Sequence, residues 1–163
     1  MPGTNNTFIK LIRHPVKFRL FLLTKLPAVY FSGIRIKHID EQQCEVTIPY
    51  KWLTRNPFRS TYFASLSMAA ELSTGALSMA HLYQRKPPVS MLVVKVESTY
   101  FKKATGKTTF TCVDGDAIRA VIEKAIADNE PQTFAATSTG VNAAGEVVAE
   151  FLITWSFKAK LKG

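Results

Sequence analysis

The chain has 163 residues, the length of one domain, and its 47% hydrophobic and 20% charged residues are ordinary for a globular protein. A chain of this size hides roughly 70% of its unfolded surface on folding, which excludes any need for a disulfide framework or a structural metal. Cys44 and Cys112 lie far apart in the sequence and alternate with apolar residues, so we predict two buried, reduced thiols.

The formal net charge of +9 arises at the ends of the chain. Ten of the 21 Lys and Arg residues lie before Asp40 or after residue 157, whereas residues 38–157 hold eleven basic and twelve acidic residues. Because the body is nearly neutral, we expect a solvated basic fringe and no nucleic-acid partner; contact of this fringe with an anionic surface is the alternative.

The sequence predicts neither a membrane span nor a secretory signal. Its most apolar N-terminal run, Leu20 to Leu23, is bracketed by Arg19 and Lys25 and falls well short of the ~20 apolar residues that a bilayer requires. The run then meets Pro27 without a small-residue cleavage site, and we therefore expect a cytoplasmic protein.

In chain order, residues 1–7 are polar and are predicted to be loose. Pro15 suits the first turn of a helix and Pro27 the end of one, with Val16, Leu20, Phe21 and Leu23 on adjoining faces. We expect this amphipathic helix to cover an apolar surface of the protein, and prefer that to a position on an anionic membrane. The predicted organisation is a tail and helix over 1–32 packed on one domain over 33–163.

From Gly33 the apolar period changes to two, which is typical of strands. Residues 34–37 and 44–50, with a turn over 40–43, predict a hairpin or one bent strand. The predicted strands that repeat this alternation later in the chain cover residues 91–102, 107–113, 133–141 and 146–158. Between the second and third of these later strands, Asp116 to Asp128 carries an apolar stripe and predicts an amphipathic helix that ends before Pro131.

A second helix is predicted over about Ser60 to Gln84, with apolar residues all around its circumference, so it should be buried on most sides. Its only formally charged side chain is Glu71. Apolar surroundings raise the pKa of a carboxyl group and can make it a general base near neutrality. A Glu on an exposed stripe, or one satisfied by a Ser or Thr, is the structural alternative.

The residues Asn56-Pro57-Phe58-Arg59-Ser60 form a turn and cap sequence ahead of this helix. The free N–H groups of a first helical turn stabilise developing negative charge. Together with a carboxylate further along, they supply the two parts that acyl-transfer hydrolysis requires. The sequence has no GxSxG, P-loop or GxGxxG motif that would favour another chemistry.

With Asn56 fifteen positions before Glu71, the sequence resembles the hotdog-fold acyl-CoA thioesterases of the phenylacetate-catabolism type, in a less characterised bacterial branch. That family has an Asn, a His-Gly-Gly at the helix start and an acidic residue in the helix. Tyr62, Phe63 and Ala64 occupy the His-Gly-Gly positions here. The segment 98–104 with Gly106 also resembles the family's strand and turn, and the resemblance covers about residues 33–158.

The resemblance implies an α+β hotdog fold, in which an antiparallel sheet wraps around a long central helix and two protomers form paired sites. It implies that Glu71 is the catalytic carboxylate and that the backbone N–H near Phe63 or Ala64 is the oxyanion donor. Asn56 would orient water or the carbonyl group. The expected assembly is a homodimer, and pairing of dimers into tetramers stays open.

Other residues complete the predicted site. Tyr62, Phe63, Ala64 and Phe58 are expected to bind substrate, and Ser90, at the entry of a strand, to line the site across the dimer interface. Leu66 and Met68 would add to the apolar lining. Lys102, Lys103 and Lys107 either form a solvated turn or bind the phosphates of coenzyme A.

The histidines His14, His38 and His81 share no ligand-like spacing, so no metal is expected, and His81 is interpreted as a packing or capping residue. No cofactor is expected apart from coenzyme A as part of the substrate. The predicted function is hydrolysis of a fatty or aromatic acyl-CoA. The alternative is a hotdog protein that binds acyl-CoA or fatty-acyl groups without turnover.

Overall fold

A computed structural model describes residues 6–160 of the chain. Three short helices come first, namely α1 (Thr7–Arg13), α2 (Pro15–Lys25) and α3 (Pro27–Phe31). The remaining elements in chain order are β1 (Arg35–Ile39), β2 (Cys44–Ile48), the 3-10 turn η1 (Trp52–Thr54), α4 (Phe63–Leu82), β3 (Val89–Tyr100), β4 (Thr108–Cys112), α5 (Gly115–Asp128), β5 (Gln132–Val141) and β6 (Val147–Ala159).

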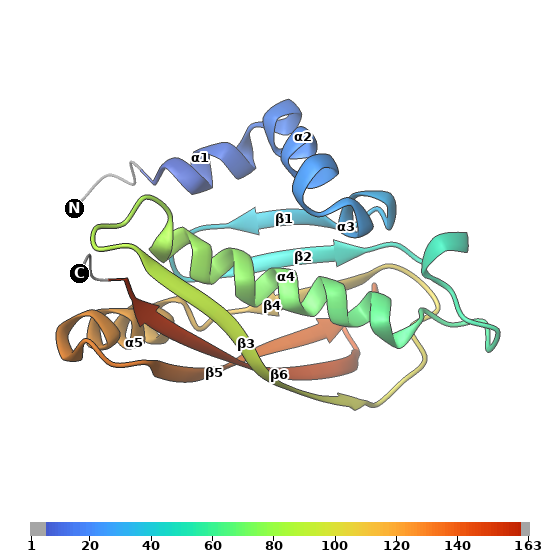
Figure 1. The fold of residues 1–163 in the computed structure, drawn as a ribbon. Helices are drawn as coiled ribbons and strands as arrows, with labels where there is room; N and C mark the ends of the chain where they lie inside the picture. Colours follow the sequence, from blue (N-terminus) through green and yellow to red (C-terminus); the bar gives the residue numbers. More distant parts are fainter. Residues whose placement is uncertain (1–5, 161–163) are drawn as a thin grey trace.

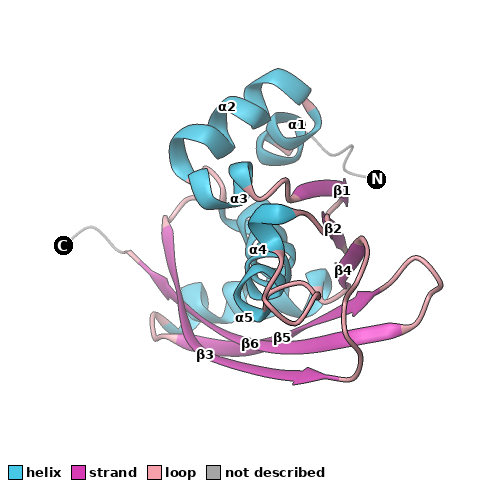
Figure 2. Ribbon diagram, turned by 90° about the vertical axis from the view of Figure 1, so that its right-hand side faces the viewer, coloured by secondary structure: helices cyan, strands magenta, loops and turns pink. Residues whose placement is uncertain are grey.

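The six strands form one antiparallel sheet in the order β1-β2-β4-β5-β6-β3. The sheet curls around α4, which lies along its concave face, while α1 and α2 lie beyond β1 (Figures 1 and 2). The long pairings β5–β6 and β3–β6 form one arm of the curl, and the short strands β1, β2 and β4 form the other.

The core lies between α4 and the concave face of the sheet. β6 shows how the sequence specifies it, because Phe151, Ile153, Trp155 and Phe157 alternate with more exposed residues and are all buried. α4 packs against the sheet through small and apolar residues along most of its length. α5 packs against α4, β5 and β6 through the predicted apolar stripe, of which Ile118, Ile122 and Ala125 are fully buried.

The α+β fold with a sheet wrapped around a long central helix is therefore confirmed. The predicted strands and the two predicted helices after residue 33 are present, with ends displaced by a few residues. Cys44 and Cys112 are buried free thiols, and they are direct register partners on β2 and β4. Burial raises the pKa of Cys112 to about 12, which leaves the thiol protonated and unreactive.

The prediction for the N-terminal region was wrong in detail. Residues 1–5 of the tail lie outside the described residues, but Thr7 already begins α1, with the Asn6 side chain accepting a hydrogen bond from the Ile9 N–H. Pro27 opens α3 as well as ending α2, because proline fits the first turn of a helix. Phe18 and Leu22 are the buried residues of α2.

The predicted faces of α2 were also wrong, since Val16, Leu20 and Leu23 point outward and are exposed. α2 thus has apolar residues on both sides, and periodicity alone could not tell which side faces the protein. Within residues 6–160, no helix is long and apolar enough to cross a membrane.

Candidate functional site

Glu71 lies midway along α4 and faces a cavity of about 280 Å³. Side chains from α1, α2, β1, α4, β3 and β6 line this cavity, and all of them except Glu71 are uncharged. The lining residues are Phe8, Phe18, Phe21, Leu22, Leu26, Ile36, Leu72, Gly75, Ala76, Met79, Met91 and Trp155. We refer to this space as the Glu71 cavity.

The carboxyl group of Glu71 makes no hydrogen bond or ion pair with any residue between 6 and 160. Removal from water raises its pKa above the usual 4.5, because no neighbouring charge offsets the cost of ionising a carboxyl group in apolar surroundings. A group placed in this way holds a proton more readily than a surface Glu, which is typical of carboxyl groups that take part in proton transfer.

The Glu71 carboxyl group and the Trp155 indole both lie against Gly75. A Cβ atom at Gly75 would lie 3.3 Å from Glu71 Oε1 and 3.3 Å from the Trp155 ring, so only a residue without a side chain leaves this space open. Trp155 is positioned by a buried hydrogen bond, because its Nε1–H donates to Thr74 Oγ1 at 2.9 Å. The Trp155 wall of the Glu71 cavity is therefore tied to α4.

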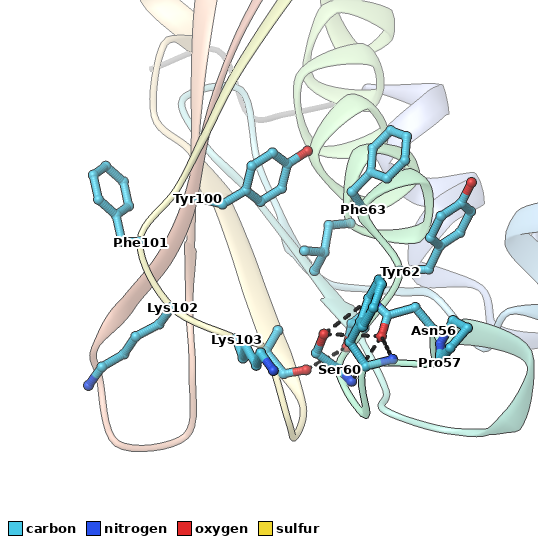
Figure 3. A pocket seen from close by; sticks show the side chains of 13 residues that line it. Asn56, Pro57, Ser60, Tyr62, Phe63, Tyr100, Phe101, Lys102 and Lys103 are labelled. Atoms are coloured by element: carbon cyan, nitrogen blue, oxygen red, sulfur yellow. Dashed lines mark hydrogen bonds between the residues drawn. The ribbon is translucent and has the colours of Figure 1, made fainter.

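The other predicted residues gather in a separate groove of about 570 Å³ at the N-terminal end of α4 (Figure 3). Asn56, Phe58, Tyr62 and Phe63 all line it, as do Lys102 and Lys103. We refer to it as the Asn56 groove. Phe58 and Phe63 are largely exposed. Tyr100 and Phe101 also line the groove, and the Tyr100 ring points toward Phe63 from the other side (Figure 3).

The side chain of Asn56 is hydrogen-bonded to the loop in which it lies. Its Oδ1 accepts from the N–H of Phe58 at 2.9 Å and of Ser60 at 3.2 Å, and its Nδ2 donates to Ser60 Oγ at 3.1 Å. The backbone N–H of Asn56 also donates to the carbonyl oxygen of Ser60 at 2.8 Å. In the single chain, these bonds hold the loop ahead of α4 and direct the amide away from the Glu71 cavity.

The start of α4 does present the expected donors. The N–H groups of Ser65 and Leu66 donate to the carbonyl oxygen of Tyr62, whereas those of Phe63 and Ala64 donate to no residue that the structure describes. With a rise of 1.5 Å per residue, however, Ala64 lies roughly 10 Å along the axis from Glu71. Within one chain, the helix start and the carboxyl group cannot act on one carbonyl group.

The remaining predicted residues lie outside both spaces. Ala64 is half-buried on α4 and lines neither of them. Ser90 lies on the edge strand β3, where its hydroxyl donates to the carbonyl oxygen of Lys158 at 3.2 Å. His81 Nε2 donates to the carbonyl oxygen of Glu41 at 2.9 Å and ties the end of α4 to the β1–β2 turn, which is the packing role expected of it.

Sequence reasoning missed most of the walls of the Glu71 cavity. The N-terminal helices supply Phe8, Phe18, Phe21 and Leu22, and Trp155 comes from the last strand. The alternation along β6 placed Trp155 on the buried face, but nothing in the sequence indicated that this face meets Glu71. The two aromatic residues of α2 could have been found only from knowledge of which face of that helix is covered.

The curled sheet, the central helix and the isolated helical carboxylate define a hotdog-fold protein. Residues 16–157 match a family model described as a domain of unknown function, DUF4442, and the chain belongs to that family. The family match gives no support to the phenylacetate-catabolism type in particular. No protein of curated function matches the sequence.

Solved structures of the same fold cover nearly the whole chain. One, from Pseudomonas aeruginosa, is described as a protein of unknown function and probable thioesterase; it is 20% identical, with a TM-score of 0.74 over 98% of this chain and 99% of that one. A protein of unknown function from Chlorobaculum tepidum is 14% identical, with a TM-score of 0.73 over 95% and 100%. A thioesterase from Haemophilus influenzae is 16% identical, with a TM-score of 0.63 over 88% and 90%. At these identities the likeness shows the fold.

Proposed function

We propose that the protein hydrolyses acyl thioesters, with acyl-CoA as the substrate class and a fatty or aromatic acyl group in the Glu71 cavity. The observation that carries this proposal is the unpaired Glu71 carboxyl group in the wall of an otherwise apolar cavity. An apolar space takes the acyl group, and a carboxyl group of raised pKa can accept a proton from water. The thioesterase descriptions of two solved structures with this fold agree with the proposal.

In the proposed reaction, the Glu71 carboxylate removes a proton from a water molecule whose oxygen attacks the thioester carbonyl carbon. The carbonyl oxygen becomes an oxyanion and is stabilised by backbone N–H groups at a helix start. When the oxyanion collapses, the C–S bond breaks, and the leaving thiolate takes the proton held by Glu71, which gives the free thiol and restores the carboxylate. The products are a carboxylic acid and the thiol carrier.

The distance between Glu71 and the N–H groups of Phe63 and Ala64 supports a site that two copies of the chain complete together. We propose that α4 of one protomer presents its N-terminal end to the Glu71 cavity of the other. Asn56 then acts as a positioning residue, because its side chain holds the loop that precedes those donors. Tyr62 and Phe63 would contact the substrate at the same place.

The edge strand β3 is the surface through which the protomers would pair. It is twelve residues long and bonded on one side only, to β6. Leu92, Val94 and Val96 are each at least half exposed on it. A long apolar edge of this kind is a template for pairing with another strand. Light scattering should therefore give twice the mass of one chain, and Val94→Lys should lower it to that of a monomer; Lys124→Gln on α5 is the matched control.

Glu71→Gln tests the reaction. The amide keeps the size of the side chain but cannot accept the proton, so turnover of acyl-CoAs of varied length should fall by about 10²- to 10⁴-fold. Glu130→Gln, at an exposed carboxyl group, is the control. Hydrolysis by purified Glu71→Gln at the wild-type rate across the panel would contradict the role of Glu71.

Binding without turnover is the second candidate function. It is favoured by the loop ahead of α4, where the Asn56 amide is already bonded and Tyr62, Phe63 and Ala64 stand in place of His-Gly-Gly. Saturable binding of acyl-CoA by the wild-type protein, with no thiol released from any member of the panel, would support this function.

A further inference from the structure

A second groove, of about 450 Å³, lies between the N-terminal helices and the free edge of β1. Its lining includes five basic or potentially basic side chains and no carboxylate. These residues are Arg13, Arg19, Arg35, Lys37 and His38. We refer to it as the arginine groove.

Three of these cations have no acidic partner among residues 6–160. Arg13 donates to the carbonyl oxygen of Ile39 at 3.1 Å, and Arg35 donates to that of Ile34 at 2.9 Å. Arg19 makes no hydrogen bond or ion pair with any described residue. Because each guanidinium has five N–H donors, all three keep donors free for a ligand.

The two other basic side chains are already neutralised. Lys37 pairs with Glu45 at 3.1 Å, and His38 lies 2.9 Å from Asp40. The positive charge of the groove therefore comes from the three arginines. A planar guanidinium binds the oxygens of a phosphate group in pairs, so a groove with three of them is suited to a ligand with more than one phosphate.

The arginine groove adjoins the Glu71 cavity. Phe18 and Ile36 line both spaces, so these two side chains form the partition between the groove and the cavity. A single molecule could therefore place an acyl group beside Glu71 and phosphate groups beside the arginines. Of the lysines that the sequence analysis considered for phosphate binding, Lys102 is already paired with Glu146.

We propose that the arginine groove binds the phosphate groups of the thioester's carrier, a nucleotide of the coenzyme A class. This inference rests on the proposed function, since it identifies the carrier of the same substrate. Phospholipid headgroups offer the same phosphate chemistry, and the experiments below separate the two sources.

The first experiment measures binding of free adenosine 3′,5′-bisphosphate, the nucleotide part of coenzyme A, by titration calorimetry. Arg19→Gln should weaken binding by about five- to tenfold and Arg19→Gln/Arg35→Gln further, since each change removes a charge-assisted contact. Lys124→Gln removes a charge on α5, which packs on β5 and β6 and so lies away from the groove at β1. This variant should bind the bisphosphate with the affinity of the wild type. Circular dichroism melting confirms that each variant is folded.

The second experiment compares two thioesters of one acyl group, with coenzyme A and with N-acetylcysteamine, which has no phosphate. In Arg19→Gln, KM for the coenzyme A thioester should rise several-fold more than KM for the N-acetylcysteamine thioester, and salt should weaken the difference in the wild type. Equal changes in both KM values would overturn the proposal, because the arginine would then act on the acyl site alone.

Failure of the arginine-groove proposal can be distinguished from failure of the proposed function. Calorimetry with the bisphosphate needs no turnover, so it judges the groove even if the protein hydrolyses nothing. Equal affinity of wild type and double variant for the bisphosphate overturns the proposal. So does arginine-dependent sedimentation with phosphatidylglycerol vesicles when the bisphosphate does not bind, because the groove would then recognise lipid headgroups.

Discussion

The two ends of the predicted site differ in how their polar groups are satisfied. In the Asn56 groove, the side-chain amide of Asn56 is bonded to Phe58 and Ser60, and the loop is held by its own hydrogen bonds. In the Glu71 cavity, the carboxyl group has apolar neighbours and no partner among the described residues. The hydrogen-bonded amide of Asn56 stabilises its loop. The carboxyl group of Glu71 has no such partner, so it stays available to exchange a proton with a substrate or with water.

The sharpest test of this contrast replaces each polar group by Ala. Asn56→Ala should lower the free energy of unfolding by about 1–2 kcal/mol, because it removes the acceptor of two loop N–H groups. Glu71→Ala should lower turnover by about 10²- to 10⁴-fold without lowering stability, because an unpaired half-buried carboxyl group is removed. Urea unfolding and steady-state kinetics on both variants measure the two effects. Equal losses of unfolding free energy and of turnover in the two variants would contradict the distinction between the two sites.

The stability of the protein should also depend more on the Trp155 wall of the Glu71 cavity than on the first turns of α4. Thr74→Val removes the acceptor of the buried Trp155 N–H and should cost about 1–3 kcal/mol of unfolding free energy. Ser67→Ala removes a hydroxyl that donates to the Phe63 carbonyl oxygen on a more exposed part of α4, and it should cost less than about 0.5 kcal/mol. Similar costs for the two variants would indicate that water replaces the Thr74 hydroxyl.

The fold could be predicted from the sequence because its determinants are local. Alternation along the strands and the uncharged run around Glu71 required only neighbouring residues, and the order of elements then fitted a known architecture. Glu71 could be singled out because it is the only formally charged side chain among the 25 residues from Ser60 to Gln84, which is visible without any contact information.

The composition of the site could not be predicted in the same way. Phe18 and Phe21 line the Glu71 cavity only because α2 lies beyond the edge strand β1, and this placement of α2 is not encoded in its helix pattern. The pairing of Cys44 with Cys112, and the partition that Phe18 and Ile36 make between two spaces, are likewise long-range contacts. Spacing from Asn56 to Glu71 suggested one site, but the rise of α4 separates the two residues in a single chain.

Substitutions in the walls of the Glu71 cavity and of the Asn56 groove should differ in their effect on the length of the acyl chain that the protein prefers. Phe21→Ala removes a phenyl ring from the wall of the Glu71 cavity and should shift the preference of kcat/KM toward longer acyl chains by about tenfold or more, because even one methylene in an apolar pocket changes kcat/KM by about that factor. Phe58→Ala in the exposed Asn56 groove is the matched control and should leave the chain-length profile in place. A shift caused by Phe58→Ala alone would place the acyl group in the Asn56 groove.

The smallest effect expected is the dependence of stability on pH, and its sign follows from the raised pKa of Glu71. Between the ordinary value of 4.5 and the higher value in the folded protein, the folded state binds a proton that the unfolded state does not. The stability contributed by this proton is fully present below 4.5 and is lost as the pH rises through the folded-state pKa. Turnover should change in the opposite direction across the same window, because only the ionised carboxylate accepts a proton from water.

The difference in melting temperature between wild type and Glu71→Gln isolates this group, since all other titrations are common to both proteins. That difference should move against the wild type as the pH rises from 4.5 through the higher folded-state pKa, and then become constant. A difference that is constant above pH 4.5 and instead moves in favour of the wild type as the pH rises toward that value would mean that the pKa of Glu71 is lowered in the folded protein. The carboxylate would then have a cationic or hydrogen-bonding partner, which would make it a satisfied group like Asn56 and remove the basis for its role as a proton acceptor.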